Sequence, residues 1–255
     1  MSNFRFKREG IVITVVVCYG DKYLTIIMSD DRVNCNIFGR HIYEDGHTKL
    51  VELPNMGWAS GAGLSDFLET FKKELSKSTV FNIEEMGSIY KKILEKSKKN
   101  RPDLSSFISK SAIVVSWVAV LEDELYLRFG VFEEENFDTE IAVCEFGNYL
   151  VLYPGDYLDD QDKIKNVSEK YLNYDNSEEE SYEKILSRMF SIFNEISSNS
   201  EQCSTHCDVG IQVVQPTGIY KIKFGGEIKE LILLLDEEKL DEKYELVQAI
   251  EFKNN

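Results

Sequence analysis

The chain lacks the features that define several large classes of proteins. None of its apolar runs approaches the ~18 residues that are needed to span a bilayer. The apolar run 11–18 continues into a hairpin pattern, which is not the charged-then-apolar layout of a secretory signal. No glycine-rich loop ending in a lysine is present to hold a nucleotide phosphate. We therefore expect a cytoplasmic protein with no membrane partner.

Positive charge is also scarce. The chain has 29 Lys and Arg residues against 45 Asp and Glu residues, which gives a formal net charge of −16. An acidic surface repels a phosphate backbone, so the composition argues against nucleic acid as a partner. The acidic clusters at 133–135, 178–180 and 236–238 are typical of solvated loops and helix starts.

Cysteines and histidines are few, and their spacing completes no known pattern. The five cysteines, an odd number, fit reduced thiols better than a disulfide framework. The segment Cys203-Ser204-Thr205-His206-Cys207 offers metal ligands, but no second pair follows at zinc spacing. The three histidines show no spacing of a catalytic triad or a two-histidine helix motif. We expect no metal and no cofactor.

The apolar pattern predicts strands in blocks that are separated by pairs of helices. Two Val- and Ile-rich strands, 11–19 and 23–29, flank a hairpin turn and are apolar on both faces. Blocks of this kind favour an α+β fold with two stacked, mainly antiparallel sheets and helices outside, as one domain over 11–255 after an N-terminal extension 1–10. The further expected elements are strands 48–53 and 56–60, helices 64–75 and from 82 onward, strands 112–121, 125–131, 139–143 and 149–152, helices 160–172 and 181–196, strands 209–215 and 219–224, and a last helix 237–250.

Three charged residues near strand ends are candidates for catalysis. Asp30 and Arg32 close one predicted strand, and Lys49 opens the next. Desolvation and Arg32 favour a neutral Lys49 amine while Asp30 favours the ammonium, and such a lysine accepts a proton or orients a nucleophile. The alternative is a buried Asp30–Arg32 ion pair beside a surface lysine. The turn at Gly61 before a helix offers backbone N–H groups that suit an oxyanion, or it is only a tight turn.

Three segments together resemble the proteasome subunits and the HslV-type peptidases, which are N-terminal-nucleophile hydrolases. The strand 24–32 ends similarly to the family's Ala-Ala-Asp-x-Arg, the segment 49–53 is similar to its lysine strand, and 57–66 is similar to its strand into the first helix. The resemblance implies a four-layer αββα sandwich. It implies that Asp30 supports a catalytic Lys49, that Gly61 donates its N–H to the oxyanion, and that Arg32 is a supporting residue. It also implies a ring or other homo-oligomer, a peptide or unfolded protein as substrate, and an ATPase unfoldase as a further partner.

The nucleophile is the main departure from this family. The family uses a threonine that becomes N-terminal after a glycine, whereas here Ile11 follows Gly10. Thr14 lies 16 residues before Asp30, a separation that looks right without gaps, but pairing across the hairpin predicts that Asp30 faces Gly10–Ile11 instead. Ser2, exposed by removal of the first methionine, lies nine residues too early.

Two further positions depart from the family pattern. Glu145 stands where the family keeps a serine near the nucleophile, and a later Asp and Ser are not clearly present, with Ser204 or Thr205 as stand-ins. We therefore expect a proteasome-subunit-like protein of threonine-peptidase lineage with impaired or altered catalysis. One alternative is an active ring-forming peptidase or small-amide hydrolase with Thr14 as nucleophile. The other is a non-catalytic structural or peptide-binding ring subunit.

Overall fold

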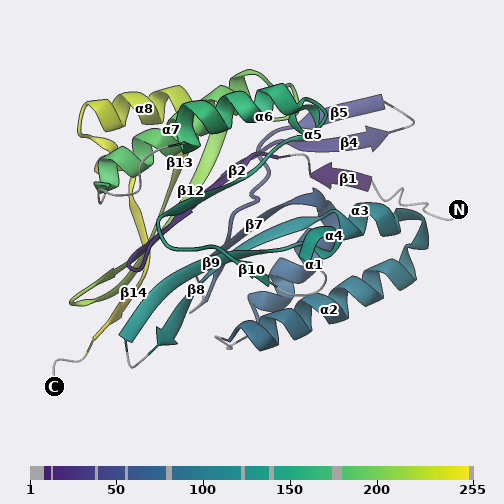
Figure 1. Cartoon of the computed structure of the whole chain (residues 1–255), viewed down its shortest axis with the longest axis horizontal. Coiled ribbons are helices and arrows are strands. Elements are labelled where there is room, and N and C mark those ends of the chain that lie inside the picture. Colours follow the sequence, from purple (N-terminus) through teal and green to yellow (C-terminus); the bar gives the residue numbers. More distant parts are fainter. Residues whose placement is uncertain are drawn as a thin grey trace, which may run out of the picture.

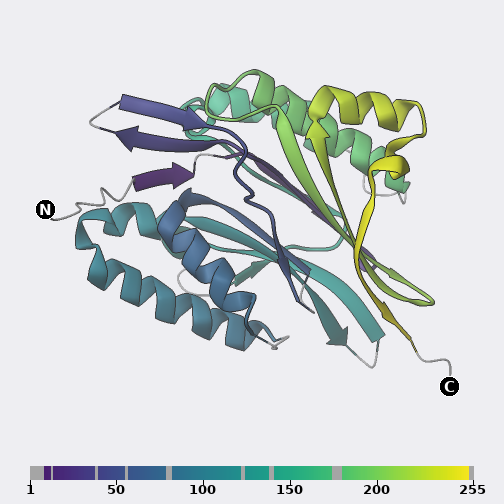
Figure 2. The same ribbon diagram turned by 180° about the vertical axis from the view of Figure 1, so that it is seen from behind.

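The computed structural model describes residues 9–12, 14–37, 40–54, 57–78, 82–121, 124–137, 141–173 and 180–252. In this part of the chain two antiparallel sheets face each other, and helices lie on the outer side of each (Figures 1 and 2). The predicted α+β class with antiparallel sheets is confirmed. Within the same residues, no helix is both long and apolar enough to cross a membrane.

The first sheet has the order β10-β9-β8-β7-β1-β4-β5, and β6 pairs with β7. Its outer side carries helices α1 to α3 (Figure 1). Asn82 begins α2 as predicted, because its side chain accepts a hydrogen bond of 2.8 Å from the backbone N–H of Glu85. The bounds are β1 Glu9–Val12, β4 Val33–Ile37, β5 Arg40–Glu44, β6 Val51–Leu53, β7 Gly57–Leu64, β8 Ala112–Leu121, β9 Glu124–Phe132 and β10 Ile141–Val143, with α1 Ser65–Leu75, α2 Ile83–Asn100, a 3₁₀ turn Pro102–Leu104, α3 Ser105–Ser109 and α4 Glu134–Phe137.

The second sheet has the order β11-β2-β3-β12-β13-β14. The long helix α7 crosses its outer side next to α6 and α8 (Figure 1). The bounds are β2 Val16–Gly20, β3 Leu24–Asp30, β11 Asn148–Leu152, β12 His206–Gln215, β13 Gly218–Glu227 and β14 Glu245–Glu251, with α5 Gly155–Leu158, α6 Gln161–Val167, a π-helical turn Ser168–Leu172, α7 Tyr182–Ser198, α8 Ile228–Asp236 and a 3₁₀ turn Leu240–Lys243.

Three groups of buried apolar side chains hold these layers together. One group joins the two sheets and includes Val16 and Ile27 from one sheet with Trp58 and Phe129 from the other. The other two groups join each sheet to its own helices. Alternate residues of β2 and β3 are therefore buried on opposite faces, which is why both strands are apolar without interruption.

The predicted strand 11–19 is wrong as a single element. Residues 9–12 form β1 in the first sheet, where Gly10 pairs with Cys35 and Val12 with Gly63. The chain then passes to the second sheet, where β2 begins at Val16. Thr14 lies in the crossing between the two sheets. A run of apolar residues gives no sign of this crossing, because its residues fit into strands of either sheet.

Two other predicted segments differ from the structure. The expected last helix 237–250 is wrong, because α8 lies earlier in the chain and residues 245–251 form the edge strand β14 instead. The stretch between the expected strands 23–29 and 48–53, to which the sequence assigns no element, forms the hairpin of β4 and β5. Residues 1–8 of the expected extension lie outside the described residues, and the division into an extension and one domain stays a prediction.

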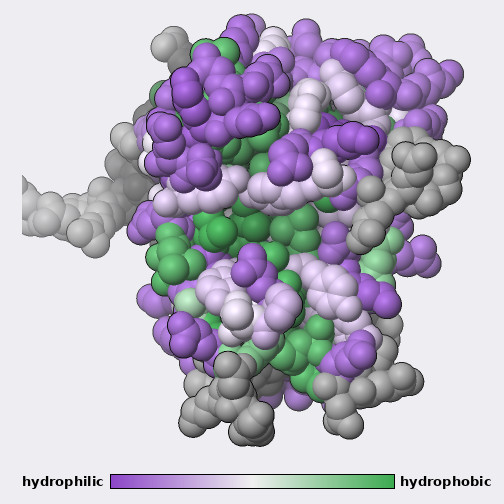
Figure 3. Space-filling model, turned by 90° about the vertical axis from the view of Figure 1, so that its left-hand side faces the viewer, coloured by the Kyte–Doolittle hydropathy of each residue, from purple (hydrophilic) through white to green (hydrophobic). Residues whose placement is uncertain are grey.

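One end of the sandwich exposes part of the core between the sheets. Figure 3 shows apolar side chains in a band between more polar regions on this face. Val118, Ile219 and Ile250 line a small cavity here together with Gln212 and Lys221. Leu24, the first residue of β3, pairs with Val213 near this end, and β3 runs from there to Asp30. The cluster around Asp30, described next, therefore lies at the opposite end of the sandwich.

Candidate functional site

The Asp30 carboxylate collects five hydrogen bonds at the point where the chain crosses between the sheets. Its Oδ1 accepts bonds from the Thr14 hydroxyl, from the backbone N–H of Val15 at 3.1 Å and from Lys49 Nζ at 3.0 Å. Its Oδ2 accepts bonds from the backbone N–H groups of Arg32 at 3.1 Å and Ser204 at 3.3 Å. We call Thr14, Asp30 and Lys49 the Asp30 cluster.

This geometry corrects the prediction that Asp30 faces Gly10–Ile11. In the structure Val16 of β2 pairs with Ser29 of β3. Asp30, the residue after Ser29, therefore lies beside Val15 and Thr14, the two residues before Val16. Gly10 and Ile11 instead pair with β4 in the other sheet. The residue that contacts Asp30 is therefore Thr14, 16 residues earlier in the chain, and not Gly10 or Ile11.

Lys49 is a buried residue and not a surface residue. Its side chain is 4% exposed, and the carboxylate that it contacts, that of Asp30, is fully buried. Burial lowers the pKa of Lys49, while the charge of Asp30 opposes this shift. The Lys49 backbone is held in turn by Lys72 of α1, whose Nζ donates to the Lys49 carbonyl at 3.1 Å. The lysine is thus fixed in place with a weakened preference for its charged form.

Gly61 lies on β7, between the residues of β7 that pair with β6 and those that pair with β1. Residues 57–59 of β7 pair with β6, which begins two residues after Lys49, and Gly63 pairs with Val12, two residues before Thr14. The strand pairing therefore brings the chain near residues 14 and 49 to either side of Gly61 on β7. That the Gly61 N–H binds an oxyanion stays a prediction. The glycine also has a packing role, because a Cβ at this position would lie 2.5 Å from the Ala112 carbonyl oxygen on β8.

Arg32 does not form the predicted alternative ion pair with Asp30. Its backbone N–H binds Asp30, but its guanidinium binds Asp45, with Nε–Oδ1 at 2.6 Å and Nη2–Oδ2 at 2.9 Å. Its Nη1 donates to the carbonyls of Glu201 at 2.9 Å and Cys203 at 3.0 Å. The hydrogen bond to Asp45 raises the pKa of Arg32 above its usual value. The same bond to Arg32 lowers the pKa of Asp45 below its usual value.

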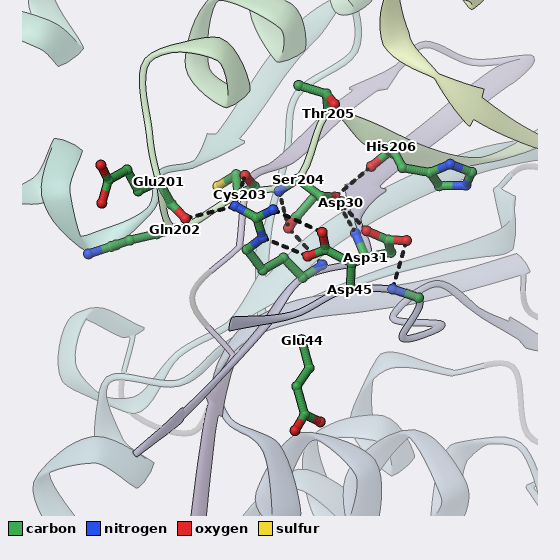
Figure 4. A network of polar contacts seen from close by, with 12 residues as sticks. Asp30, Asp31, Glu44, Asp45, Glu201, Gln202, Cys203, Ser204, Thr205 and His206 are labelled. Carbon is green, nitrogen blue, oxygen red and sulfur yellow. Dashed lines mark hydrogen bonds and ion pairs between the residues drawn. The ribbon is translucent and has the colours of Figure 1, made fainter. Parts of the chain in front are cut away.

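Asp31 and Ser204 are site residues whose roles the sequence did not establish. The Ser204 hydroxyl donates to the Asp31 carboxylate and also contacts the carbonyl of His206 at 3.1 Å. Asp31 Oδ2 accepts a bond of 2.9 Å from the Gly46 N–H. Figure 4 shows Asp30, Asp31 and Asp45 around Ser204 and Cys203, whereas the Glu44 side chain points away. Of the two predicted stand-ins, Ser204 lies at the site, and the Thr205 hydroxyl binds Glu227 instead.

Glu145 does not lie near Thr14, which corrects the prediction for that residue. Gly147, two residues later, donates its N–H to the Gly20 carbonyl at 2.8 Å, at the far end of β2. Five residues of strand separate Val15 from Gly20, or about 16 Å. The near end of β11 is Leu152, which pairs with Val16, so residues after 152 approach the site instead.

Alternative reactive groups at the site have weak support. Cys203 is buried, and burial raises the pKa of its thiol well above the ordinary value, so the thiol stays protonated. No group of three His, Cys, Asp or Glu side chains in the described segments is placed to hold a metal ion. Ser2 lies outside the described residues. The hydroxyl that remains beside both an acid and a lysine is that of Thr14.

The Asp30 cluster has the parts of a nucleophile with its activating groups. The Thr14 hydroxyl and the Lys49 amine both donate to one oxygen of Asp30, so the hydroxyl proton already has a carboxylate acceptor that the lysine shares. Thr14 is fully buried, and its nitrogen belongs to the peptide bond with Ile13. With this peptide bond in place, Thr14 has no free α-amine.

Comparison with known proteins adds no family assignment, since no family model matches the chain and no curated protein matches it.

Proposed function

We propose that this chain is the precursor of an N-terminal-nucleophile hydrolase of the proteasome-subunit type, with Thr14 as its latent nucleophile. The observation that carries the proposal is the shared contact of the Thr14 hydroxyl and Lys49 Nζ with Asp30 Oδ1. The resemblance of the three segments to that family supports it, as do the two facing sheets with helices outside. The proposal replaces the expectation of impaired catalysis, which rested on the nucleophile register together with Glu145 and the unclear later Asp and Ser.

The first chemical step is the release of Thr14 from the preceding residue. The Thr14 Oγ1 attacks the carbonyl carbon of Ile13 and passes its proton toward Lys49 or Asp30, and the C–N bond to Thr14 breaks as the Thr14 nitrogen takes up a proton. Water then hydrolyses the resulting ester, which returns the hydroxyl and leaves an α-amine on Thr14. This amine is the base that completes an N-terminal threonine site.

The second step is the hydrolysis of a peptide or other amide. The Thr14 oxygen attacks the substrate carbonyl, the leaving amine takes a proton, and water releases the acyl group. The lowered pKa of Lys49 suits this step, because a lysine that gives up its proton more readily is a better proton carrier near neutral pH. Gly61 lies in the region where the oxyanion would form, and its N–H is the proposed donor.

A second candidate is a non-catalytic subunit that keeps its chain intact. It is favoured by the residue before Thr14, since Ile13 stands where the resembling family has a glycine. It is also consistent with the complete burial of Thr14. In that case the Asp30 cluster would be structural, and the chain would act by assembly or by binding peptides.

The test is turnover of a panel of fluorogenic peptide amides by variants at Thr14. Thr14→Ala removes the hydroxyl and should abolish turnover, whereas Thr14→Ser keeps a hydroxyl and should retain measurable turnover. Thr25→Val is the matched control, because Thr25 on β3 is also fully buried but its hydroxyl has no hydrogen-bond partner in the structure. Turnover that survives Thr14→Ala would refute the assignment, and a lack of turnover in the wild type would favour the non-catalytic subunit.

The expected partners remain predictions. A ring of copies, a peptide or unfolded protein as substrate and an ATPase unfoldase would follow from the family resemblance. The cytoplasmic location and the lack of nucleic-acid and membrane partners rest on the composition alone.

A further inference from the structure

The buried Lys49 lies between two loops that have no regular secondary structure. One loop, residues 45–48, leads directly into Lys49 and is exposed over its whole length. The other, residues 201–205, contains Ser204, which binds Asp30 and Asp31. Loops without ladder hydrogen bonds open locally at low cost in free energy, so the placement of Lys49 depends on what holds them.

Arg32 contacts both loops with one side chain. Its Nε and Nη2 bind the two carboxylate oxygens of Asp45, and its Nη1 binds the carbonyls of Glu201 and Cys203. Only a planar guanidinium presents donors in these directions at once, and a lysine ammonium would not replace it. The residue before it, Asp31, binds the same two loops through the Gly46 N–H and the Ser204 hydroxyl.

The Arg32–Asp45 pair is poorly suited to stabilising the fold as a whole. The Asp45 side chain is 51% exposed, and ion pairs at such sites contribute little to the free energy of unfolding. Its two-point geometry, however, fixes the orientation of the loop that carries Asp45. A contact that orients strongly and stabilises weakly is typical of a positioning role.

We propose that Arg32 and Asp45 form a clamp that holds the loops 45–48 and 201–205 closed around the Asp30 cluster, and that Asp45 is a positioning residue for Lys49. The clamp is defined by Arg32, Asp45 and the carbonyls of Glu201 and Cys203. Its effect on turnover rests on the proposed function, but its effect on loop opening does not. The clamp therefore has a readout of its own.

Hydrogen exchange of the full-length protein measures the opening of the two loops. In Asp45→Asn we expect backbone amides in both loops to exchange about fivefold faster than in the wild type, as follows from losing an exposed two-point ion pair. Asp45→Glu restores the charge and should recover most of the protection. Asp103→Asn is the matched control, because Asp103 forms a similar exposed two-point pair with Arg101, at 3.1 and 2.8 Å, but between α2 and α3.

Alkylation of cysteines reports the same opening from the second loop. Cys203 is 2% exposed, and its own carbonyl accepts a hydrogen bond from Arg32. Asp45→Asn should therefore raise the rate at which iodoacetamide alkylates Cys203 by about the same fivefold factor. Cys18, fully buried between the sheets, should stay protected in every variant and shows that the fold is intact. High salt should speed the labelling of Cys203 in the wild type and have little further effect in Asp45→Asn.

The outcomes separate the clamp from the proposed function. Faster exchange in both loops with a lower kcat and an unchanged KM supports the positioning role. Unchanged exchange in Asp45→Asn, faster exchange in the 45–48 loop alone, an equal effect of Asp103→Asn, or an unchanged kcat in an active enzyme would overturn it. If the wild type shows no turnover at all, the proposed function fails, and the exchange and alkylation rates alone decide whether the clamp exists.

Discussion

The ion pair between Lys49 and Asp30 leads to a prediction about folding stability that does not depend on catalysis. The two side chains are 4% and 0% exposed and are joined at 3.0 Å. Removing one partner of such a buried pair costs roughly 3–5 kcal/mol, because the other charge is left uncompensated. In Lys49→Met the Asp30 carboxylate keeps three backbone N–H donors, so we expect a loss of about 3 kcal/mol.

The double variant sharpens this prediction. Asp30→Asn alone leaves a buried ammonium and should cost about 4 kcal/mol, whereas Lys49→Met with Asp30→Asn removes both charges and should cost at least ~2 kcal/mol less than the sum of the single losses. Urea unfolding followed by tryptophan fluorescence is the assay, since Trp58 and Trp117 are both buried. Lys77→Met, in an exposed pair with Glu74, is the control and should cost less than about 0.5 kcal/mol. Additive losses, or a Lys49→Met loss no larger than the control, would show that the buried pair does not exist.

Two further predictions concern β7 and the helix side of the second sheet. Gly61→Ala would place its Cβ 2.5 Å from the Ala112 carbonyl oxygen and 3.1 Å from Ile113 Cα, so it should lower the free energy of unfolding by roughly 1–3 kcal/mol in urea titration, whereas Gly226→Ala, whose nearest contact would be 3.5 Å, should have little effect. Equal losses in the two variants would contradict the close approach of β7 and β8. Burial raises the pKa of Tyr157 from 10.0 to about 12, so the folded protein keeps its phenol protonated while the unfolded chain releases the proton first. The contribution of the buried phenol to the free energy of unfolding is therefore complete below pH 10 and declines as the pH rises toward about 12. In urea titrations at pH 8 to 11, the free energy of unfolding should fall less with pH in Tyr157→Phe than in the wild type. A pH dependence identical to that of the wild type would be evidence against the buried phenol.

Much of the site follows from local sequence patterns. Asp30 ends a strand and Lys49 begins the approach to another, and both patterns are visible in the order of apolar and charged residues. The small residues before α1 also mark the region of Gly61, but Gly61 lies within β7, which runs to Leu64, and not in the expected turn. These features are local because each depends on the strand or helix that the residue terminates.

The crossing at Thr14 could not be found in this way. Residues 11–19 are apolar or β-branched throughout apart from Cys18 and Tyr19, with no glycine or proline to mark a change of sheet. The continuous pattern therefore predicts one strand. The misplacement of Asp30 has a separate cause, the register of the hairpin: Gly20 pairs with Thr25, so Asp30 comes opposite Val15. The contact is established only by the pairing of β2 with β3 and of β1 with β4 and β7.

The clamp and the last strand were hidden for different reasons. Arg32 meets the carbonyls of Glu201 and Cys203 from 169 and 171 residues away, and no local pattern encodes such a contact. The segment 237–250 mixes charged and apolar residues as an exposed helix does. An edge strand with exposed side chains, such as Leu246 and Ile250 of β14, shows the same mixture.

Intact mass and N-terminal sequencing of the purified wild-type protein and of Thr14→Val test the release of Thr14 most directly. The proposed function predicts that the wild type yields a chain beginning at Thr14, with its first 13 residues removed, and that Thr14→Val stays uncut because it has no hydroxyl to attack the Ile13 carbonyl. An uncut wild-type chain would contradict the account, and so would cleavage of both proteins at the same bond, which would identify another protease as the cause.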